Sequence, residues 1–279
     1  MTVILVRHGR STANTSGVLA GRSEGVSLDD TGRTQAAALV DRLGGCLGDI
    51  DAVVRSPLQR CAETVEPVLA ALATARPDTV PELVVDDLAE VDYGDWTGRT
   101  IKELLSEPLW KTVQQHPSAA VFPNGEGLAD VQARAVSAIR ELDRRLGGPD
   151  GDRVWLACSH GDVIKSIIAD AMGMHLDSFQ RIVVEPASIS VIRYTSTRPY
   201  VHTVNSTAVP SVPRPSKNSG PAGDDAVVGG ATGVGPDGNG PDGNGPDGNG
   251  PDGNGADQHG ADARDARAPE PAAGAVAHR

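Results

Sequence analysis

The sequence is poor in aromatic residues and cysteines, and it has no long apolar run. Aromatic side chains make up 3% of the 279 residues, and the cysteines are Cys46, Cys61 and Cys158. An odd number of cysteines without metal-like spacing argues against a disulfide-rich scaffold and against a zinc finger. No apolar run approaches the length of a membrane span, and no export signal follows Met1, so we expect reduced thiols and a cytoplasmic location.

Positive charge is also scarce. The chain holds 25 Lys and Arg against 37 Asp and Glu, and its formal net charge is −12. Such a chain is a poor candidate for nonspecific binding to nucleic acids or to anionic membranes. A local basic pocket for a small anion is still compatible with this balance.

Large apolar side chains almost disappear after residue 205. Residues 1–205 alternate apolar runs with helical and turn composition, enough for one domain with a single core. Residues 206–279 are rich in Pro, Gly, Ala and Asp, and we expect this tail to be disordered because it cannot offset its ordering entropy. The tail repeats GPDGN four times between Gly235 and Asn254. This pattern favours a solvated spacer over a partner-binding segment.

Apolar β-branched runs alternate with amphipathic helical patterns along the first 205 residues. Strands are expected at 2–8, 51–56, within 81–98, at 152–161, 189–194 and 200–205. Helices are expected at 27–43 with Asp30 or Thr31 as N-cap, at 57–72 with Pro57 in the first turn, at 128–146 and at 162–173. The alternation predicts a three-layer α/β fold, in which helices cover both faces of a mostly parallel sheet. A short turn joins the last two strands, so we expect antiparallel pairing at the sheet edge.

Side chains suited to binding an anion follow the ends of several predicted strands. In chain order they are Arg7, His8, Arg60, Glu90 and His160. The carboxyl ends of parallel strands share one edge of the sheet, where ligands of α/β proteins bind. Arginine matches phosphate oxygens with a planar fork, and helix N-termini after these strands add N–H groups. The sequence therefore predicts a phosphate site at this edge.

The histidine at the end of the first strand is a candidate nucleophile. Guanidinium groups near His8 disfavour its protonated form, and a neutral imidazole keeps a lone pair that can attack phosphorus. Taken singly, the residues have simpler explanations: a capping histidine, a surface arginine, or a solvated loop carboxylate. Arg134, on the helix at 128–146, is interpreted in the same way as a salt-bridge partner. Phosphate binding without catalysis is therefore an open alternative.

Five segments in chain order resemble the signature of the histidine phosphatase superfamily, the group that includes the cofactor-dependent phosphoglycerate mutases. They are LVRHGRSTAN, SPLQRCAET, LAEVDYGDWTG, PNGEGLADVQAR and SHGDVIK. RHG alone is a weak signal, but five segments in this order are a strong one. Residues 1–205 resemble most closely an actinobacterial branch described as phosphomutases, and the tail lies outside the resemblance. The resemblance implies a phosphoglycerate mutase-like fold.

The resemblance also implies a role for each candidate residue. His8 is expected to accept the phosphoryl group, and Arg7 and Arg60 to clamp the phosphate. His160 is expected to bind the transferring group, and Glu90 to protonate the leaving oxygen and then to activate water. The remaining wall of the phosphate pocket is implied to be formed by Ser11, Asn14, Gly21 and the backbone of Gly161.

Some positions depart from the mutase pattern. Ala20 stands where mutases tend to carry a hydroxyl, and Gly127 replaces a usual serine. The segment 93–124 lacks a cluster of basic residues for a second anionic group, for which Lys102 and Lys111 are the candidates. We therefore predict a phosphatase that hydrolyses a phosphomonoester through a phosphohistidine.

Three other functions remain as alternatives: a phosphoglycerate-type phosphomutase, a phosphoprotein phosphatase acting on phosphohistidine among other residues, and a non-catalytic phosphate-binding module. The expected partner is a small phosphorylated metabolite, with no nucleic acid and no membrane, and the oligomeric state is left open. No metal and no other cofactor is expected, because arginines take the place of a cation in neutralising phosphate charge. For the same reason, a zinc triad of His8, Glu90 and His160 is disfavoured.

Two further interpretations concern single residues. Arg55 looks like a phosphate clamp, but the arginine that matches the family segment is Arg60. Trp96, Trp110 and Phe122 are interpreted either as an apolar wall of the entrance or as core residues.

Overall fold

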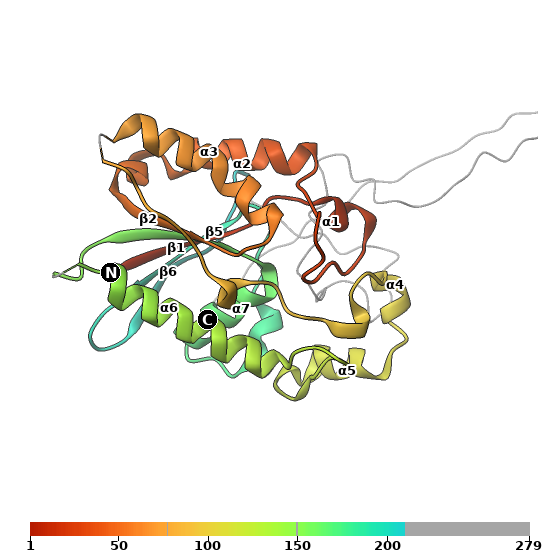
Figure 1. The fold of residues 1–279 in the computed structure, drawn as a ribbon. Helices are drawn as coiled ribbons and strands as arrows, with labels where there is room; N and C mark the ends of the chain where they lie inside the picture. The colour runs from red at the N-terminus through yellow and green to blue at the C-terminus, as the bar shows by residue number, and fades with distance from the viewer. Residues whose placement is uncertain (77, 149, 210–279) are drawn as a thin grey trace, which may run out of the picture. The chain divides into compact units, whose positions relative to one another are not determined.

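The computed structural model describes residues 1–209 except residues 77 and 149, and in this part a single six-stranded sheet forms the centre (Figure 1). The strand order is β3-β2-β4-β1-β5-β6. The pairs β1–β4, β2–β4 and β2–β3 are parallel, and β5 runs antiparallel to both β1 and β6. The predicted mostly parallel sheet with antiparallel pairing at one edge is confirmed. The strands are β1 (Thr2–Arg7), β2 (Ile50–Arg55), β3 (Glu82–Val84), β4 (Val154–Ser159), β5 (Ile189–Tyr194) and β6 (Pro199–Ser206).

Helices cover both faces of the sheet, so the predicted three layers are confirmed. Figure 1 shows α2 and α3 on one face and α6 and α7 on the other. The α-helices are α1 (Thr12–Ser16), α2 (Asp30–Leu43), α3 (Gln59–Ala75), α4 (Ile101–Leu104), α5 (Pro108–Gln115), α6 (Leu128–Leu146) and α7 (Gly161–Ala171). Short 3₁₀ helices are η1 (Gly44–Asp49), η2 (Asp86–Leu88), η3 (Gly94–Trp96), η4 (Pro117–Ala119) and η5 (Leu176–Arg181).

The first strand shows how the sequence pattern produces this layering. Successive side chains of a strand point to opposite faces of the sheet. Val3 and Leu5 therefore join the core under α6 and α7, while Ile4 and Val6 join the core under α2 and α3. All four are buried, which explains why the strand reads as a continuous apolar run.

Two predicted helix starts are wrong by one or two residues. The N-cap of α2 is Asp29, not Asp30 or Thr31, because the Asp29 carboxylate accepts a hydrogen bond from the Gly32 amide at 2.7 Å. Gly32 also packs directly on the loop after β1, since a Cβ there would lie 1.9 Å from the Arg10 carbonyl oxygen.

Helix α3 begins at Gln59 rather than at Pro57. The Ser56 amide donates to the Cys158 carbonyl of β4, and the Leu58 amide donates to the Ser56 hydroxyl, so these residues stay extended. Arg60 nevertheless lies in the first turn of α3, as predicted.

The segment 93–124 contains two helices, α4 and α5, for which no helix was predicted from the sequence. The ring of Trp96 stacks on Trp110 with centroids 6.1 Å apart and meets the edge of Phe122 at 5.3 Å. All three side chains are at most 7% exposed. They belong to the core, not to an entrance wall.

The predicted tail at 206–279, with its GPDGN repeats, falls outside the described residues from residue 210 onward. In the described part of the chain, no helix combines the length and the apolar character that crossing a membrane requires. Cys46, Cys61 and Cys158 are all free thiols.

Candidate active site

The register between the two central strands brings both predicted histidines together. Arg7 at the end of β1 pairs with Ser159 at the end of β4, and the His8 amide donates to the Ser159 carbonyl at 3.0 Å. The next residues on the two strands are His8 and His160, whose ring centroids lie 5.2 Å apart. Both lie at the carboxyl ends of parallel strands, the edge that the sequence predicted.

Hydrogen bonds determine which nitrogen of His8 carries the lone pair. Nδ1 lies 2.7 Å from the Gly9 carbonyl oxygen, which accepts only, so Nδ1 holds the proton. The Arg60 guanidinium donates from Nε to His8 Nε2 at 3.3 Å. Nε2 is therefore an unprotonated acceptor, the state in which an imidazole acts as a nucleophile.

The second histidine lies between a hydroxyl and a carboxyl group. His160 Nε2 is 2.7 Å from the Ser56 hydroxyl, and Nδ1 is 3.9 Å from Glu90 Oε2. The Cys61 thiol lies 3.6 Å from the same Nε2. Ser56 was not among the predicted site residues, because a serine directly before a helix is typical of a helix cap.

Two arginines are buried around the histidines. Arg60 donates from Nη2 to the Gly21 carbonyl at 2.9 Å, and Arg7 donates from Nη1 to the Val184 carbonyl at 2.7 Å. Within the described residues, Arg60 Nη1 and His160 Nδ1 are buried and have no hydrogen-bond partner. Buried polar atoms are normally satisfied, so these two identify a place for a polar ligand.

The electrostatic surroundings keep both imidazoles neutral. The pKa of His8 lies well below its ordinary value because of burial first, then the charges of Arg60 and Arg7. The pKa of His160 is lowered in the same way, by burial and then by Arg60. The expected effect of the guanidinium charges is confirmed in direction, although burial is the larger cause.

Glu90 has the opposite shift. Burial, followed by the negative charge of Asp162, raises the pKa of its carboxyl to about 7. The protein itself therefore supplies the raised pKa of this carboxyl. Asp162, which was not among the predicted site residues, accepts from the Tyr93 hydroxyl at 2.9 Å and pairs with Lys165 at 3.5 Å.

The other predicted pocket residues have local roles. Ser11 and Asn14 hydrogen-bond to each other in a capping box at the start of α1. Gly21 contributes the carbonyl that holds Arg60, and Gly161 is the first residue of α7, directly after His160. Their contact with a ligand stays a prediction.

Several charged residues considered in the sequence lie elsewhere. Arg55 pairs with Glu82 on β3, which agrees with the choice of Arg60 as the clamp. Lys102 and Lys111 are exposed. Arg134 pairs with Glu126, as interpreted, and it also donates to the backbone carbonyls of Glu90 and Ala89.

No group of three or more His, Cys, Asp or Glu side chains within the described residues is arranged to hold a metal ion. His8, Glu90 and His160 are neighbours, but two guanidinium groups lie among them, which makes a dication unfavourable there.

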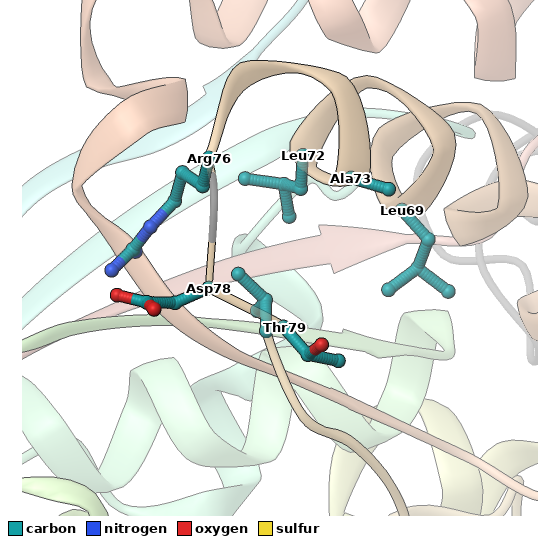
Figure 2. A pocket seen from close by; sticks show the side chains of 7 residues that line it. Leu69, Leu72, Ala73, Arg76, Asp78 and Thr79 are labelled. Carbon is teal, nitrogen blue, oxygen red and sulfur yellow. The ribbon is translucent and has the colours of Figure 1, made fainter.

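A separate cavity of ≈ 140 Å³ lies at the C-terminal end of α3 (Figure 2). Leu69, Leu72 and Ala73 form one side, and Arg76 and Asp78 lie on the other. Arg76 donates to the Ile50 carbonyl at the start of β2, so this cavity lies at the amino end of the sheet. Its described lining includes no histidine and no cysteine, and we assign the chemistry to the carboxyl end.

Comparison with known proteins agrees with this geometry. Residues 3–207 match the histidine phosphatase superfamily (branch 1). An acid phosphatase of Mycobacterium tuberculosis is 35% identical over 190 residues, which cover 68% of this chain and 84% of that protein. Phosphoserine phosphatase 1 of Hydrogenobacter thermophilus is 27% identical over 211 residues, which cover 74% and 92%. The solved structure of the alpha-ribazole phosphatase from Shigella flexneri has a TM-score of 0.63 and 26% identity, covering 76% of this chain and 100% of that one. This chain therefore belongs to the histidine phosphatase superfamily and is a phosphoric monoester hydrolase of that family.

Proposed function

We propose that the protein hydrolyses small phosphomonoesters through a phosphohistidine formed on His8. The observation that carries the proposal is the hydrogen-bonding state of His8. Its Nδ1 donates to Gly9, while its Nε2 lone pair faces the Arg60 guanidinium at 3.3 Å. A nucleophilic lone pair thus lies beside the cation that would bind the phosphoryl oxygens.

In the first step, His8 Nε2 attacks phosphorus, and the bond from phosphorus to the ester oxygen breaks. The electron pair of that bond goes to the leaving oxygen, which takes the proton of Glu90. A carboxyl with a pKa of about 7 is protonated often enough at neutral pH to act as this acid. Arg7, Arg60 and His160 Nδ1 would stabilise the equatorial oxygens.

In the second step, a water molecule attacks the phosphohistidine. Glu90, now ionised, accepts the proton of the water, the bond from phosphorus to nitrogen breaks, and inorganic phosphate is released. His8 regains its lone pair and Glu90 its proton, so the cycle closes without a metal or an organic cofactor.

The buried charges favour an anionic substrate. The guanidinium groups of Arg60 and Arg7 lie close enough to His8 to lower its pKa, so both would attract the negative oxygens of a phosphoryl group bound there. This supports a phosphomonoester anion as the substrate. Named relatives act on phosphoserine and alpha-ribazole phosphate, and we infer a small phosphorylated metabolite of this kind for this chain.

The experiment compares the wild-type chain with His8→Ala on a panel of phosphomonoesters, measuring release of inorganic phosphate. We expect release by the wild type and a loss of about 10⁴-fold or more in His8→Ala, the scale found when a nucleophile is removed. Equal release by both would contradict the mechanism, and binding of phosphate without turnover would leave a non-catalytic binding module.

A second arm of the experiment separates hydrolysis from mutase activity. 3-Phosphoglycerate with a bisphosphoglycerate primer is followed by NMR. We expect inorganic phosphate as the product, and formation of 2-phosphoglycerate would instead support a phosphomutase. Activity found with phosphopeptides alone, including phosphohistidine peptides, would instead support a phosphoprotein phosphatase.

We also propose a domain boundary and a cellular location for the protein. The catalytic domain is proposed to be 1–205, followed by a tail that acts as a spacer, so removal of 206–279 should leave turnover unchanged. A cytoplasmic location is proposed from the thiols, and reducing conditions should leave the activity intact.

A further inference from the structure

Three side chains outside the reacting groups surround the backbone that carries the proton donor. Arg22 comes from the loop that also contains Gly21, Glu126 precedes α6, and Arg134 lies in the second turn of α6. We call these three residues the Glu126 clamp. None of them belongs to the predicted catalytic set.

Glu126 connects the two arginines. Its carboxylate forms an ion pair with Arg22 Nη2 at 2.9 Å and accepts hydrogen bonds from Arg134 Nε and Nη2 at 2.8 and 3.0 Å. It also accepts from the Asp92 amide at 2.9 Å. These hydrogen bonds outweigh the effect of burial, so the pKa of Glu126 lies below its ordinary value and the group is ionised.

The two arginines in turn bind the backbone of the acid. Arg22 Nε donates to the Glu90 carbonyl at 2.9 Å, and Arg134 Nη2 donates to the same oxygen at 3.2 Å. Arg134 Nη1 also donates to the carbonyls of Ala89 and Asp87, at 2.9 and 2.6 Å. The chain on both sides of Glu90 is therefore tied to one carboxylate.

The position of the Glu90 carboxyl depends on this backbone. Glu90 Oε1 accepts from the amide of the next residue, Val91, at 2.9 Å, so the carboxyl moves with its own main chain. Its other oxygen lies 3.9 Å from His160 Nδ1. A proton donor misplaced by about 1 Å can lose a large part of its effect.

The close approach of the loop before α6 supports the same role. A Cβ on Gly125 would lie 2.3 Å from the Asp92 carbonyl oxygen, so only a glycine lets Glu126 reach this backbone. The Glu126 amide donates to the same Asp92 carbonyl at 2.8 Å.

We propose that Glu126, acting through Arg22 and Arg134, is the positioning residue for the proton donor Glu90. The inference rests on the proposed function, in which Glu90 protonates the leaving oxygen. Glu126 does not touch the substrate in this account. Its removal should weaken only the step in which the leaving group needs a proton.

The test uses two substrates that differ in their leaving groups. p-Nitrophenolate leaves without a proton, whereas the alkoxide of an alkyl phosphate such as glycerol 2-phosphate needs one. The measured quantity is kcat/KM, which covers the steps up to cleavage of the ester and excludes the later attack of water. In Glu126→Gln we expect kcat/KM to fall by about tenfold or more for the alkyl phosphate and by less than about threefold for p-nitrophenyl phosphate.

Three variants show whether the loss of activity belongs to the Glu126 clamp. Arg140 lies on the same helix as Arg134, and Arg140→Met removes an exposed ion pair with Asp170 of α7, so it should leave the ratio of the two substrates unchanged. Arg22→Met removes one arginine of the clamp, and folding should tolerate the change because this side chain is 40% exposed. It should show the selective fall in kcat/KM for the alkyl phosphate even if Glu126→Gln does not fold. Arg22→Lys should recover part of the lost ratio, because a lysine keeps one of the two donors.

Glu90→Gln distinguishes failure of this inference from failure of the proposed function. Suppose that in Glu90→Gln kcat/KM falls selectively for the alkyl phosphate. If in folded Glu126→Gln and Arg22→Met kcat/KM then falls equally for both substrates, or for neither, the clamp is only structural and the inference is wrong. If Glu90→Gln itself treats both substrates alike, the acid role in the proposed function is wrong.

Discussion

The two ends of the central sheet use the same residue types with different consequences. At the carboxyl end, Arg7, Arg60 and Glu90 are at most 3% exposed, and the pKa of Glu90 is raised to about 7. Toward the amino end, Arg140 pairs with Asp170 while its side chain is 55% exposed, and Arg76 lies 3.7 Å from Asp51 in a pair that also reaches solvent. Charges at the first end are held out of water, and those at the second end are solvated.

The difference shows that burial, rather than residue identity, prepares a charged group for chemistry. A solvated ion pair is screened and contributes about 0–1 kcal/mol to stability. Buried charges interact strongly, and each one changes the protonation of its neighbours. At the carboxyl end this places the neutral imidazole of His8 beside two guanidinium groups and raises the pKa of the Glu90 carboxyl to about 7.

The largest effect on activity is expected when one arginine is removed, and its size should differ between the two ends of the sheet. Arg60→Met should lower kcat/KM for p-nitrophenyl phosphate by about 10²–10³-fold, because it removes a donor that stabilises charge in a site shielded from water. Arg140→Met, the matched variant at the other end, should stay within about twofold of the wild type. Equal losses in both variants would mean that burial does not separate the two ends.

The pH dependence should reflect the buried acid. Glu90 must be protonated to donate, and its pKa is about 7, so activity is lost as pH rises through that value. For an alkyl phosphate, kcat/KM should fall by about tenfold per pH unit above the pKa. For p-nitrophenyl phosphate, kcat/KM should fall only weakly above this pKa. A flat profile for the alkyl phosphate between pH 7 and 9 would contradict the assignment.

The smallest effect concerns stability. The folded-state pKa of Glu90 is raised from 4.5 to about 7, so the folded state keeps this proton longer than the unfolded chain, and stability is lost as pH rises across that interval. Glu90→Gln removes this loss. Relative to the wild type, its free energy of unfolding should gain roughly 2 kcal/mol between pH 5 and pH 8.

Urea unfolding of both proteins at the two pH values measures this change. All other titrating groups are common to the two proteins, so their contributions largely cancel in the difference. A difference that does not change with pH would show that Glu90 is not perturbed in the folded state.

The sequence predicted the layers and the strand-end residues because both depend on local pattern. Apolar runs locate β1 and β4, and the residues that follow these strands, His8 and His160, are placed by them. The N-cap of α2 was misplaced by one or two residues because three neighbouring polar residues, Asp29, Asp30 and Thr31, are all good caps. The hydrogen bond from the Gly32 amide to the Asp29 carboxylate decides between them.

The missed residues act through tertiary contacts that no local pattern reports. Asp162 is acidic at a helix start, where acidic residues are common, and its effect on Glu90 appears only when two distant segments meet. Glu126 and Arg22 are separated by about a hundred positions in the chain, yet they share one ion pair at 2.9 Å. Trp96 lies in the core because it stacks on Trp110 of α5, a helix that was not predicted from the sequence.

Trapping of the phosphoenzyme tests the central claim most directly. In Glu90→Gln, p-nitrophenyl phosphate needs no acid to phosphorylate His8, while the loss of the base slows the attack of water, so the intermediate should accumulate. We expect quenched protein to carry one phosphoryl group on His8, stable in alkali and lost in acid, and to carry none when His8→Ala is added. Continued release of nitrophenol with no phosphoryl group on His8, or with one on another residue, would contradict the account.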